Sequence, residues 1–166
     1  DFPTGGIILG RDGIREAYRS GRGRIVMRAR AHIEELRGGK TAVIVTELPY
    51  GVKKGGDDGV IRKIADLVRE NTISEISAIK DLSDKTGMRI QVELKREAVP
   101  QVVLNKLYKH TPLQTTFGYN AVALVDGVPR TLSLLELIRY YLDHQREVVT
   151  RRLKYELRNA VRRAHI

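Results

Sequence analysis

The C-terminal segment constrains the fold of this chain more than any other part of it. From Thr131 to Ile166 the sequence contains neither Gly nor Pro. This absence and the spacing of its apolar residues predict one helix over Leu132–Ile166, about 50 Å long at 1.5 Å per residue. A long helix with a narrow apolar stripe usually packs against another long helix, which this sequence does not contain. The stripe repeats every three or four residues, through Leu134, Ile138, Leu142, Gln145, Val149, Leu153, Leu157, Ala160 and Ala164.

The preceding residues show two other periodicities. Arg24–Glu34 alternates apolar and polar residues, which predicts a strand, and the turn Arg37–Lys40 joins it to a second strand at Thr41–Glu47. A second hairpin is predicted at Ile73–Lys80 and Met88–Leu94. Helical spacing marks Asp12–Ser20, the residues around Ile61–Val68, and Ala98–Lys109, in which Val102, Val103, Leu104 and Leu107 are expected to be buried.

The order hairpin, helix, hairpin, helix indicates an α+β fold with a largely antiparallel sheet. We predict three parts: an α+β DNA-binding domain over residues 1–118, a connector over 119–130 that is less regular, and the long helix over 131–166. The chain begins with Asp1 rather than Met, so we expect it to be a fragment of a longer protein.

The charge balance narrows the class of partner. Thirty Lys and Arg against 20 Asp and Glu give a formal net charge of +10 and a pI near 10.0. Such an excess favours polyanions through counterion release, and nucleic acid is the preferred partner over an anionic membrane or a merely solubilised surface. The sequence has no apolar run of membrane-spanning length and no signal peptide. It has no Cys either, which excludes disulfides and thiolate metal sites and agrees with a cytoplasmic location.

The candidate binding residues are arginines near the N-terminus. Two of them are four residues apart on the first predicted helix, one lies between Gly21 and Gly23, and the rest lie at even spacing on the first predicted strand. The planar guanidinium suits phosphate contacts that hold a duplex without reading its sequence. The competing interpretation is a solvated face whose arginines pair with acids elsewhere. The predicted DNA-binding set is Arg15, Arg19, Arg22, Arg24, Arg28 and Arg30.

Other chemistry is not indicated by the residues. The four His have no metal-ligand spacing, and the common hydrolase and nucleotide-binding motifs are missing, so no catalytic or metal-binding residue is assigned. Asp57-Asp58-Gly59 is interpreted as a turn. The basic residues of the long helix are interpreted as a solvated surface with pairs such as Glu147–Arg151.

Many short motifs, in order along the chain, resemble the tower region and the start of the coiled-coil arm in the A subunits of bacterial type IIA DNA topoisomerases. The runs after Phe117 and after His144 are more similar to the A subunit of DNA gyrase than to its topoisomerase IV counterpart, which is the alternative. The motifs are Asp1–Gly6, Ala17–Gly23, Glu47–Tyr50, Ser83-Asp84, Gly87–Ile90, Leu104–Tyr108, Leu113-Gln114, Phe117–Asn120, His144–Arg152 and Arg163–Ile166.

This resemblance implies a role in an isomerase that supercoils DNA by passing one duplex through another at the expense of ATP. The tower would hold the backbone of the gated duplex, and the long helix would lead to the exit gate. The full enzyme would be a heterotetramer of two A and two B subunits on double-stranded DNA. ATP and Mg²⁺ would be bound through the B subunits, with no cofactor in this piece. None of the seven Tyr stands in the family's nucleophile motif, so the fragment alone should be inactive.

Two further hypotheses come from other classes. The chain could be a structural or assembly arm without DNA binding of its own, whose arginines pair internally. It could also be an RNA-binding module, but two Phe and no Trp offer few aromatic rings for stacking on bases.

Overall fold

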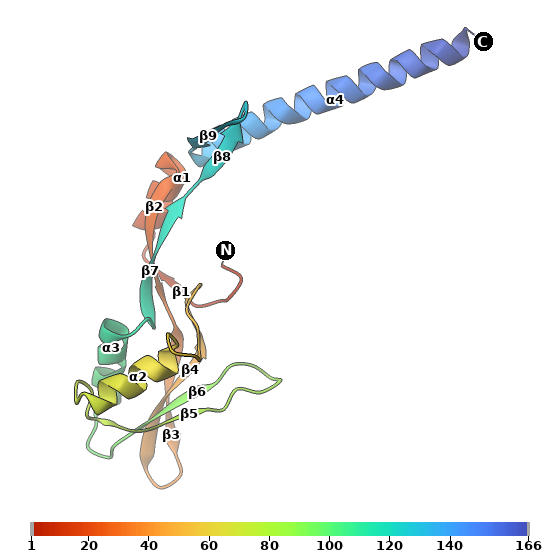
Figure 1. Cartoon of the computed structure of the whole chain (residues 1–166). Coiled ribbons are helices and arrows are strands. Elements are labelled where there is room, and N and C mark those ends of the chain that lie inside the picture. Colours follow the sequence, from red (N-terminus) through yellow and green to blue (C-terminus); the bar gives the residue numbers. More distant parts are fainter. Residues whose placement is uncertain (1, 166) are drawn as a thin grey trace. The chain divides into compact units, whose positions relative to one another are not determined.

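The computed structural model describes residues 2–165 in two compact units (Figure 1). The first unit comprises Asp1–Arg11 and Ile25–Phe117, and the second comprises Asp12–Arg24 and Gly118–Ile166. Asp1 and Ile166, which the predicted first domain and long helix included, lie outside the described residues. The three-part division remains a prediction, and the structure adds that Asp12–Arg24 groups with C-terminal residues instead of its neighbours in sequence.

The first unit is built on a four-stranded antiparallel sheet of order β3-β4-β6-β5. Its strands are β3 (Arg30–Leu36), β4 (Lys40–Glu47), β5 (Ile76–Asp81) and β6 (Ile90–Leu94). The two predicted hairpins are confirmed, and they join because β4 pairs with β6, with Val43 opposite Val92. The α+β class with an antiparallel sheet is therefore confirmed.

One face of this sheet and two helices form the hydrophobic core. The helices are α2 (Val60–Arg69) and α3 (Pro100–His110), which Figure 1 shows near the sheet. Fully buried members of the core are Val43, Val45, Ile64, Ile90, Val92, Val103 and Leu107. Val102, predicted to be buried with its neighbours on α3, is 47% exposed because the buried face of α3 is narrower than the apolar run in the sequence.

The loop before α2 has a defined role. Carbonyls of Lys53 and Lys54 accept hydrogen bonds from the amides of Val60 and Ile61 at 2.9 and 3.2 Å. Two of the free amides of the first helical turn are thus satisfied by backbone carbonyls, and the N-cap Gly59 provides no side-chain cap. The Asp57–Gly59 segment is a turn, as predicted.

The predicted single strand Arg24–Glu34 is wrong. It divides at Ala29 into β2 (Arg22–Arg28) and β3, which belong to different sheets. Strand β2 lies between β1 (Ile7–Leu9) and β7 (Gln114–Asn120) in a three-stranded sheet. The alternation of apolar residues continues across the break because Ala29 is itself fully buried, so the sequence pattern did not show it.

The second unit contains α1 (Asp12–Ser20), the hairpin of β8 (Val122–Val125) and β9 (Val128–Thr131), and α4 (Leu134–Ala164). Helix α1 has the predicted bounds. The interval predicted to be an irregular connector is instead largely paired strand, because Asp126 and Gly127 adopt positive φ and form a tight hairpin turn.

Two glycines pack this unit closely. Gly21 ends α1 with φ +77°, and its carbonyl accepts a hydrogen bond from the amide of Ala121 at 2.8 Å. A Cβ on Gly21 would meet the carbonyl of Leu132, and a Cβ on Gly23 would lie 2.7 Å from the Cβ of Ala17. The backbone therefore approaches its neighbours closely at both glycines that flank Arg22.

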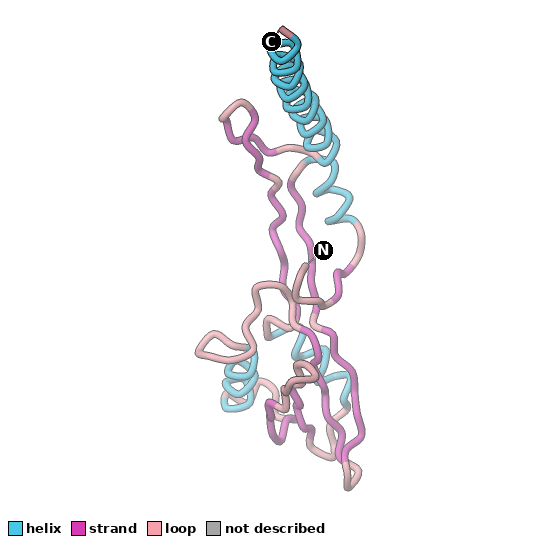
Figure 2. The backbone as a smooth tube through the Cα atoms, turned by 90° about the vertical axis from the view of Figure 1, so that its right-hand side faces the viewer, coloured by secondary structure: helices cyan, strands magenta, loops and turns pink. Residues whose placement is uncertain are grey.

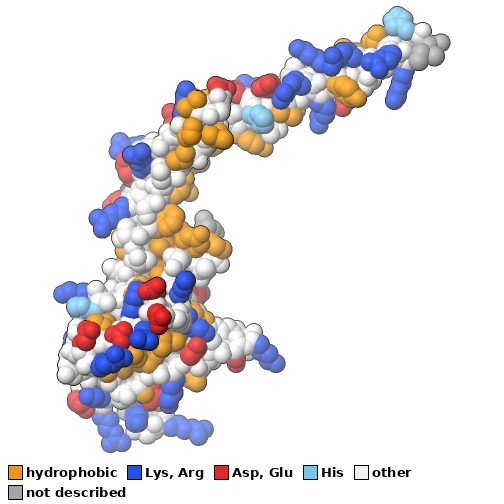
Figure 3. Space-filling model, viewed as in Figure 1, with side chains coloured by type: hydrophobic (Ala, Val, Ile, Leu, Met, Phe, Trp, Pro, Cys, Tyr) orange, Lys and Arg blue, Asp and Glu red, His pale blue; other side chains and the backbone are white. Residues whose placement is uncertain are grey.

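Helix α4 is one continuous helix of 31 residues (Figures 1 and 2). It begins with a capping box: the Ser133 hydroxyl accepts from the Glu136 amide, and the Glu136 carboxylate accepts from the Ser133 amide at 2.7 Å. The predicted helix is confirmed; it begins two residues later than predicted and ends at Ala164, with His165 as its C-cap. None of its described residues is buried, and its hydrophobic side chains reach the surface beside basic ones (Figure 3).

Candidate nucleic-acid interface

The six predicted arginines fall into two groups. Arg15 and Arg19 on α1 and Arg22 and Arg24 on β2 belong to the second unit, while Arg28 and Arg30 belong to the first. The prediction that Arg24, Arg28 and Arg30 project from one face of a single strand is wrong, because β2 ends at Arg28.

On α1, both arginines have acidic neighbours on the same helix. Arg19 donates to the Glu16 carboxylate through Nε at 3.1 Å and Nη2 at 2.7 Å, and this contact lowers the pKa of Glu16. Arg15 lies 3.7 Å from Asp12, with both side chains largely exposed. Pairs in such exposed positions are weak, so both guanidinium groups stay available to a polyanion at little cost.

Arg22 and Arg24 differ from the α1 arginines because neither forms an ion pair with any residue in the range 2–165. Both are exposed on β2. Within the described residues, Arg22 hydrogen-bonds through its backbone: its carbonyl accepts from the Ser20 hydroxyl at 2.9 Å, and its amide donates to that hydroxyl at 3.2 Å. The two glycines beside Arg22 bring the backbone close to α1 and to Leu132, and the Arg22 side chain itself is exposed. Among the described residues, β2 therefore presents two exposed positive charges that have no acidic partner.

Arg28 is held by neutral groups. Its Nε and Nη2 donate to the Oε1 atom of Gln114 at 2.9 and 2.6 Å, and its guanidinium lies 4.3 Å from the centroid of the Tyr108 ring. These contacts orient the charge without neutralising it. Sequence reasoning missed Tyr108 and Gln114 as partners because each is about eighty residues away from Arg28 in the chain. The only sequence signal was that both stand in motifs of the family resemblance.

Arg30 is compensated by an acid. Its Nε lies 3.1 Å from the Glu47 carboxylate, which also accepts a hydrogen bond from the Gly6 amide at 2.6 Å. The Gly6 amide first, and Arg30 second, lower the pKa of Glu47. This carboxylate therefore stays ionised and ties the N-terminal segment to the end of β4. The DNA-binding role of Arg30 remains a prediction.

The sheet face opposite the helices carries charges that are already paired. Arg89 donates to both oxygens of Glu34, at 3.1 and 2.6 Å, and His32 lies 2.7 Å from the same carboxylate. Lys80 contacts Glu93 on the neighbouring strand. Arg89 and Lys80 are thus each compensated by an acid, unlike Arg22 and Arg24.

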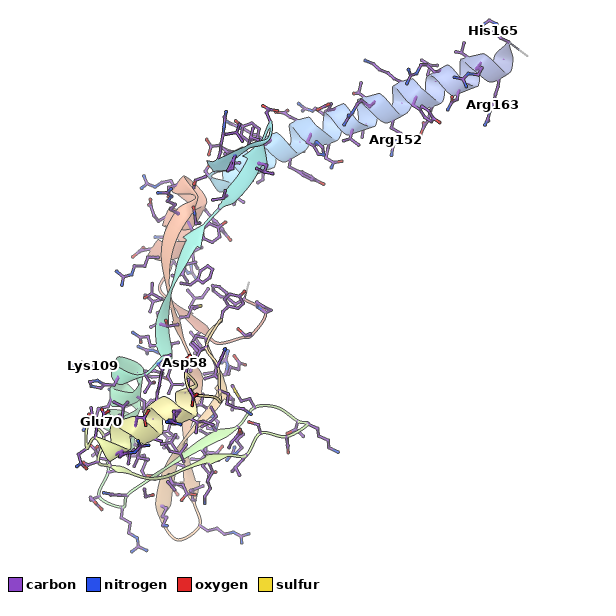
Figure 4. All side chains as sticks on the ribbon, viewed as in Figure 1. Asp58, Glu70, Lys109, Arg152, Arg163 and His165 are labelled. Carbon is purple, nitrogen blue, oxygen red and sulfur yellow. The ribbon has the colours of Figure 1, made fainter. Side chains whose placement is uncertain are left out.

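Helix α4 has the intrahelical pairs that its sequence predicted. Arg151 lies 3.7 Å from Glu147 and Arg146 lies 3.6 Å from Asp143. Figure 4 shows Arg152 and Arg163 on the outside of the helix, and Arg152 lies 3.8 Å from Glu156. The basic character of α4 is thus partly compensated along its first two thirds.

The structure offers little other chemistry. Within residues 2–165, no group of three or more His, Asp or Glu side chains is placed to hold a metal ion. Burial raises the pKa of the Tyr108 phenol, an effect that nearby Arg28 only partly opposes, and this is the reverse of what activates a tyrosine nucleophile. Across the same described range, no helix is both long and apolar enough to cross a membrane.

The chain is thus an α+β protein with exposed arginines on β2, and comparison with known proteins gives its family. Residues 1–166 match the family model that describes the A subunit of DNA gyrase and topoisomerase IV, and the chain belongs to that family.

Curated proteins similar to this chain include several named as the A subunit of DNA gyrase. The chain is 56% identical to the one from Pseudomonas aeruginosa over 168 aligned residues and 54% identical to one from Mycolicibacterium smegmatis over 167. Each alignment covers 100% of this chain but only 18% and 20% of the respective relative. The chain therefore spans about a fifth of the length of the relatives it matches.

Proposed function

We propose that this chain is the part of a type IIA topoisomerase that holds the gated DNA duplex by its phosphates and links it toward the exit gate. The observation that carries the proposal is the exposure of Arg22 and Arg24 on β2 without any acidic partner in residues 2–165. The formal charge of +10 and the family membership support it. Contacts of this kind position a protein on DNA without reading its sequence.

The family membership supports further parts of the proposal. In the whole enzyme, we propose, this chain works in the cytoplasm as part of a heterotetramer of two A and two B subunits. ATP and Mg²⁺ would bind through the B subunits, and ATP would drive supercoiling and strand passage. The nucleophilic tyrosine would lie outside residues 1–166, so that this chain holds DNA and does not cut it. Gyrase is preferred to topoisomerase IV because the similar relatives carry that name.

Duplex binding by the chain tests the phosphate-holding role. Dissociation constants for random-sequence duplexes would be measured between about 50 and 200 mM salt by fluorescence anisotropy, the range over which phosphate contacts show their salt dependence. Each lost phosphate contact lowers the slope of log K against log salt by about 0.9. The double variant Arg22→Gln/Arg24→Gln should therefore lower the slope by roughly two and weaken binding to all sequences alike.

The matched control is Arg146→Gln/Arg151→Gln, which removes the same formal charge from two residues of α4 that already pair with acids. This control should keep the wild-type slope to within about half a unit. Equal effects of the two double variants would mean that binding follows net charge alone. Absence of duplex binding by the wild-type chain at low salt would refute the proposal.

A second candidate function, an assembly arm, is favoured by the exposed apolar side chains of α4. Leu142, Leu153 and Leu157 are 48, 53 and 64% exposed and lie on the predicted stripe. Sedimentation of the chain with and without duplex separates the two functions. An arm without DNA binding would associate through α4 and show no change in sedimentation when duplex is added.

A further inference from the structure

We propose that a groove in the first unit, lined by Arg28, Asn105, Tyr108, Lys109 and Gln114, binds one phosphodiester group of a nucleic-acid backbone. This proposal rests on the proposed function and deepens it, because it assigns a defined site to Arg28 and adds residues of α3 and β7. All five residues belong to the first unit.

The first argument is the way in which Arg28 is held. Nε and Nη2 of its guanidinium donate to Gln114, which leaves Nη1 and the second hydrogen of Nη2 free to donate to a ligand. The Tyr108 ring supports the guanidinium plane at 4.3 Å. A guanidinium fixed by a neutral amide and an aromatic ring keeps its full charge and loses little side-chain entropy when it binds an anion.

The second argument is the composition of the groove. Two cations and two side-chain amides line it, and no carboxylate does. Elsewhere in the first unit, cations in fixed positions have acids beside them: Arg30 contacts Glu47, Arg89 contacts Glu34, and Lys106 contacts Glu75. Arg28 is thus a fixed cation whose compensating charge is not supplied by the residues that line its groove.

The third argument comes from the two lysines of α3. Lys106 is used internally by Glu75, whereas Lys109 is exposed and lines the groove. Figure 4 shows Lys109 on α3 with its side chain extending from the helix. Asn105 lies one helical turn before Lys109, so their side chains share a face of α3. A phosphate oxygen at this groove can accept from a guanidinium, an amide and an ammonium group.

The state of Tyr108 agrees with this assignment. Burial raises the pKa of its phenol, so the ring carries no negative charge at neutral pH. The groove therefore keeps its positive charge over the range in which the protein is assayed, and a phosphodiester, which is singly charged at every pH of interest, matches it.

The test inserts one negative charge opposite Arg28 without changing the shape of the side chain. Gln114→Glu keeps both hydrogen bonds to Arg28 and turns them into an ion pair. We expect it to weaken duplex binding about tenfold at low salt and to lower the slope of log K against log salt by about one. Lys109→Gln, a change at an exposed position, should lower the slope by a similar amount. The matched control is Gln145→Glu on α4, which makes the same charge change far along the sequence and should leave the slope unaltered.

The outcomes separate this proposal from the proposed function. Suppose that Gln114→Glu and Lys109→Gln both keep the wild-type slope of log K against log salt, while Arg22→Gln/Arg24→Gln lowers it. This result overturns the groove as a phosphodiester site and leaves the proposed function standing. Absence of binding by the wild-type chain overturns both. A direct measurement is the NMR signal of the Arg28 Nε–H, which should shift when a short duplex is added at micromolar concentration. If inorganic phosphate shifted the same signal with the same dissociation constant as the duplex, the groove would be a site for free anions, and its assignment to the nucleic-acid backbone would be overturned.

Discussion

Replacing Gly23 by Ala tests how closely β2 approaches α1, and with it the platform that presents Arg22 and Arg24. An ideal Cβ on Gly23 would lie 2.5 Å from the carbonyl oxygen of Gly13 and 2.7 Å from the Cβ of Ala17. Ordinary van der Waals contact begins near 3.4 Å, so α1 must move away by roughly 1 Å or the strand must bend. Inserting a methyl group into such a packed contact costs about 1–3 kcal/mol.

For a chain of this size, 1 kcal/mol shifts the unfolding temperature by about 2–4 °C, so we expect Gly23→Ala to lower it by roughly 2–12 °C. Circular dichroism in the far ultraviolet, which follows helix content, gives the unfolding temperature. Relative to the wild-type chain, amide hydrogen exchange in Gly23→Ala should become faster in α1 and stay unchanged in α3, because the added methyl group acts only within the second unit.

Gly118→Ala is the matched control for this prediction. It adds the same methyl group on β7, where a Cβ meets nothing within 4 Å. Its unfolding temperature should stay within about 2 °C of wild type, which corresponds to about 0.5 kcal/mol. Equal unfolding temperatures for Gly23→Ala and Gly118→Ala would refute the reasoning, because they would show that α1 and β2 are not in contact at Gly23.

Three further changes have specific expected results. Ile64→Ala removes a fully buried side chain from the core of the first unit and should destabilise the chain by about 2–5 kcal/mol in urea unfolding. Ser133→Ala removes the capping box of α4 and should lower stability by about 1 kcal/mol, with fraying confined to the first turn in amide exchange. Glu34, whose pKa Arg89 lowers from 4.5 to about 2, contributes stability that is present above pH 4.5 and is lost as the pH falls toward 2. Glu34→Gln should therefore flatten the dependence of the urea midpoint on pH in that window, and an unchanged acid dependence would contradict the role of this ion pair.

The regular elements could be predicted from the sequence because their signals are local. Helix α4 has its stripe, its missing Gly and Pro, and a Ser133–Glu136 box, and each of these signals comes from residues three or four positions apart or from the local residue type. The hairpin of β3 and β4 is marked by Gly38-Gly39, which adopt positive φ in the turn. Such features depend on backbone preference and on periodic burial, which the amino-acid order contains directly.

The break at Ala29 could not be predicted for a physical reason. A small buried residue continues the alternation of a strand, so two strands of different sheets have the same pattern as one. The exposure of Val102 was missed for a similar reason. The apolar residues of α3 extend beyond the face of the helix that packs on the core, and the sequence does not show where that face ends.

The sequence by itself determined the α+β class, the long helix and the excess of arginine, because composition and periodicity depend only on residues that are near one another in the chain. Only the tertiary structure decided what each arginine does with its charge. Arg30 meets Glu47 and Arg28 meets Gln114, while Arg22 and Arg24 meet no acid among residues 2–165. Those partners are set by strand pairing and helix packing between segments up to 86 positions apart, and no local pattern encodes them.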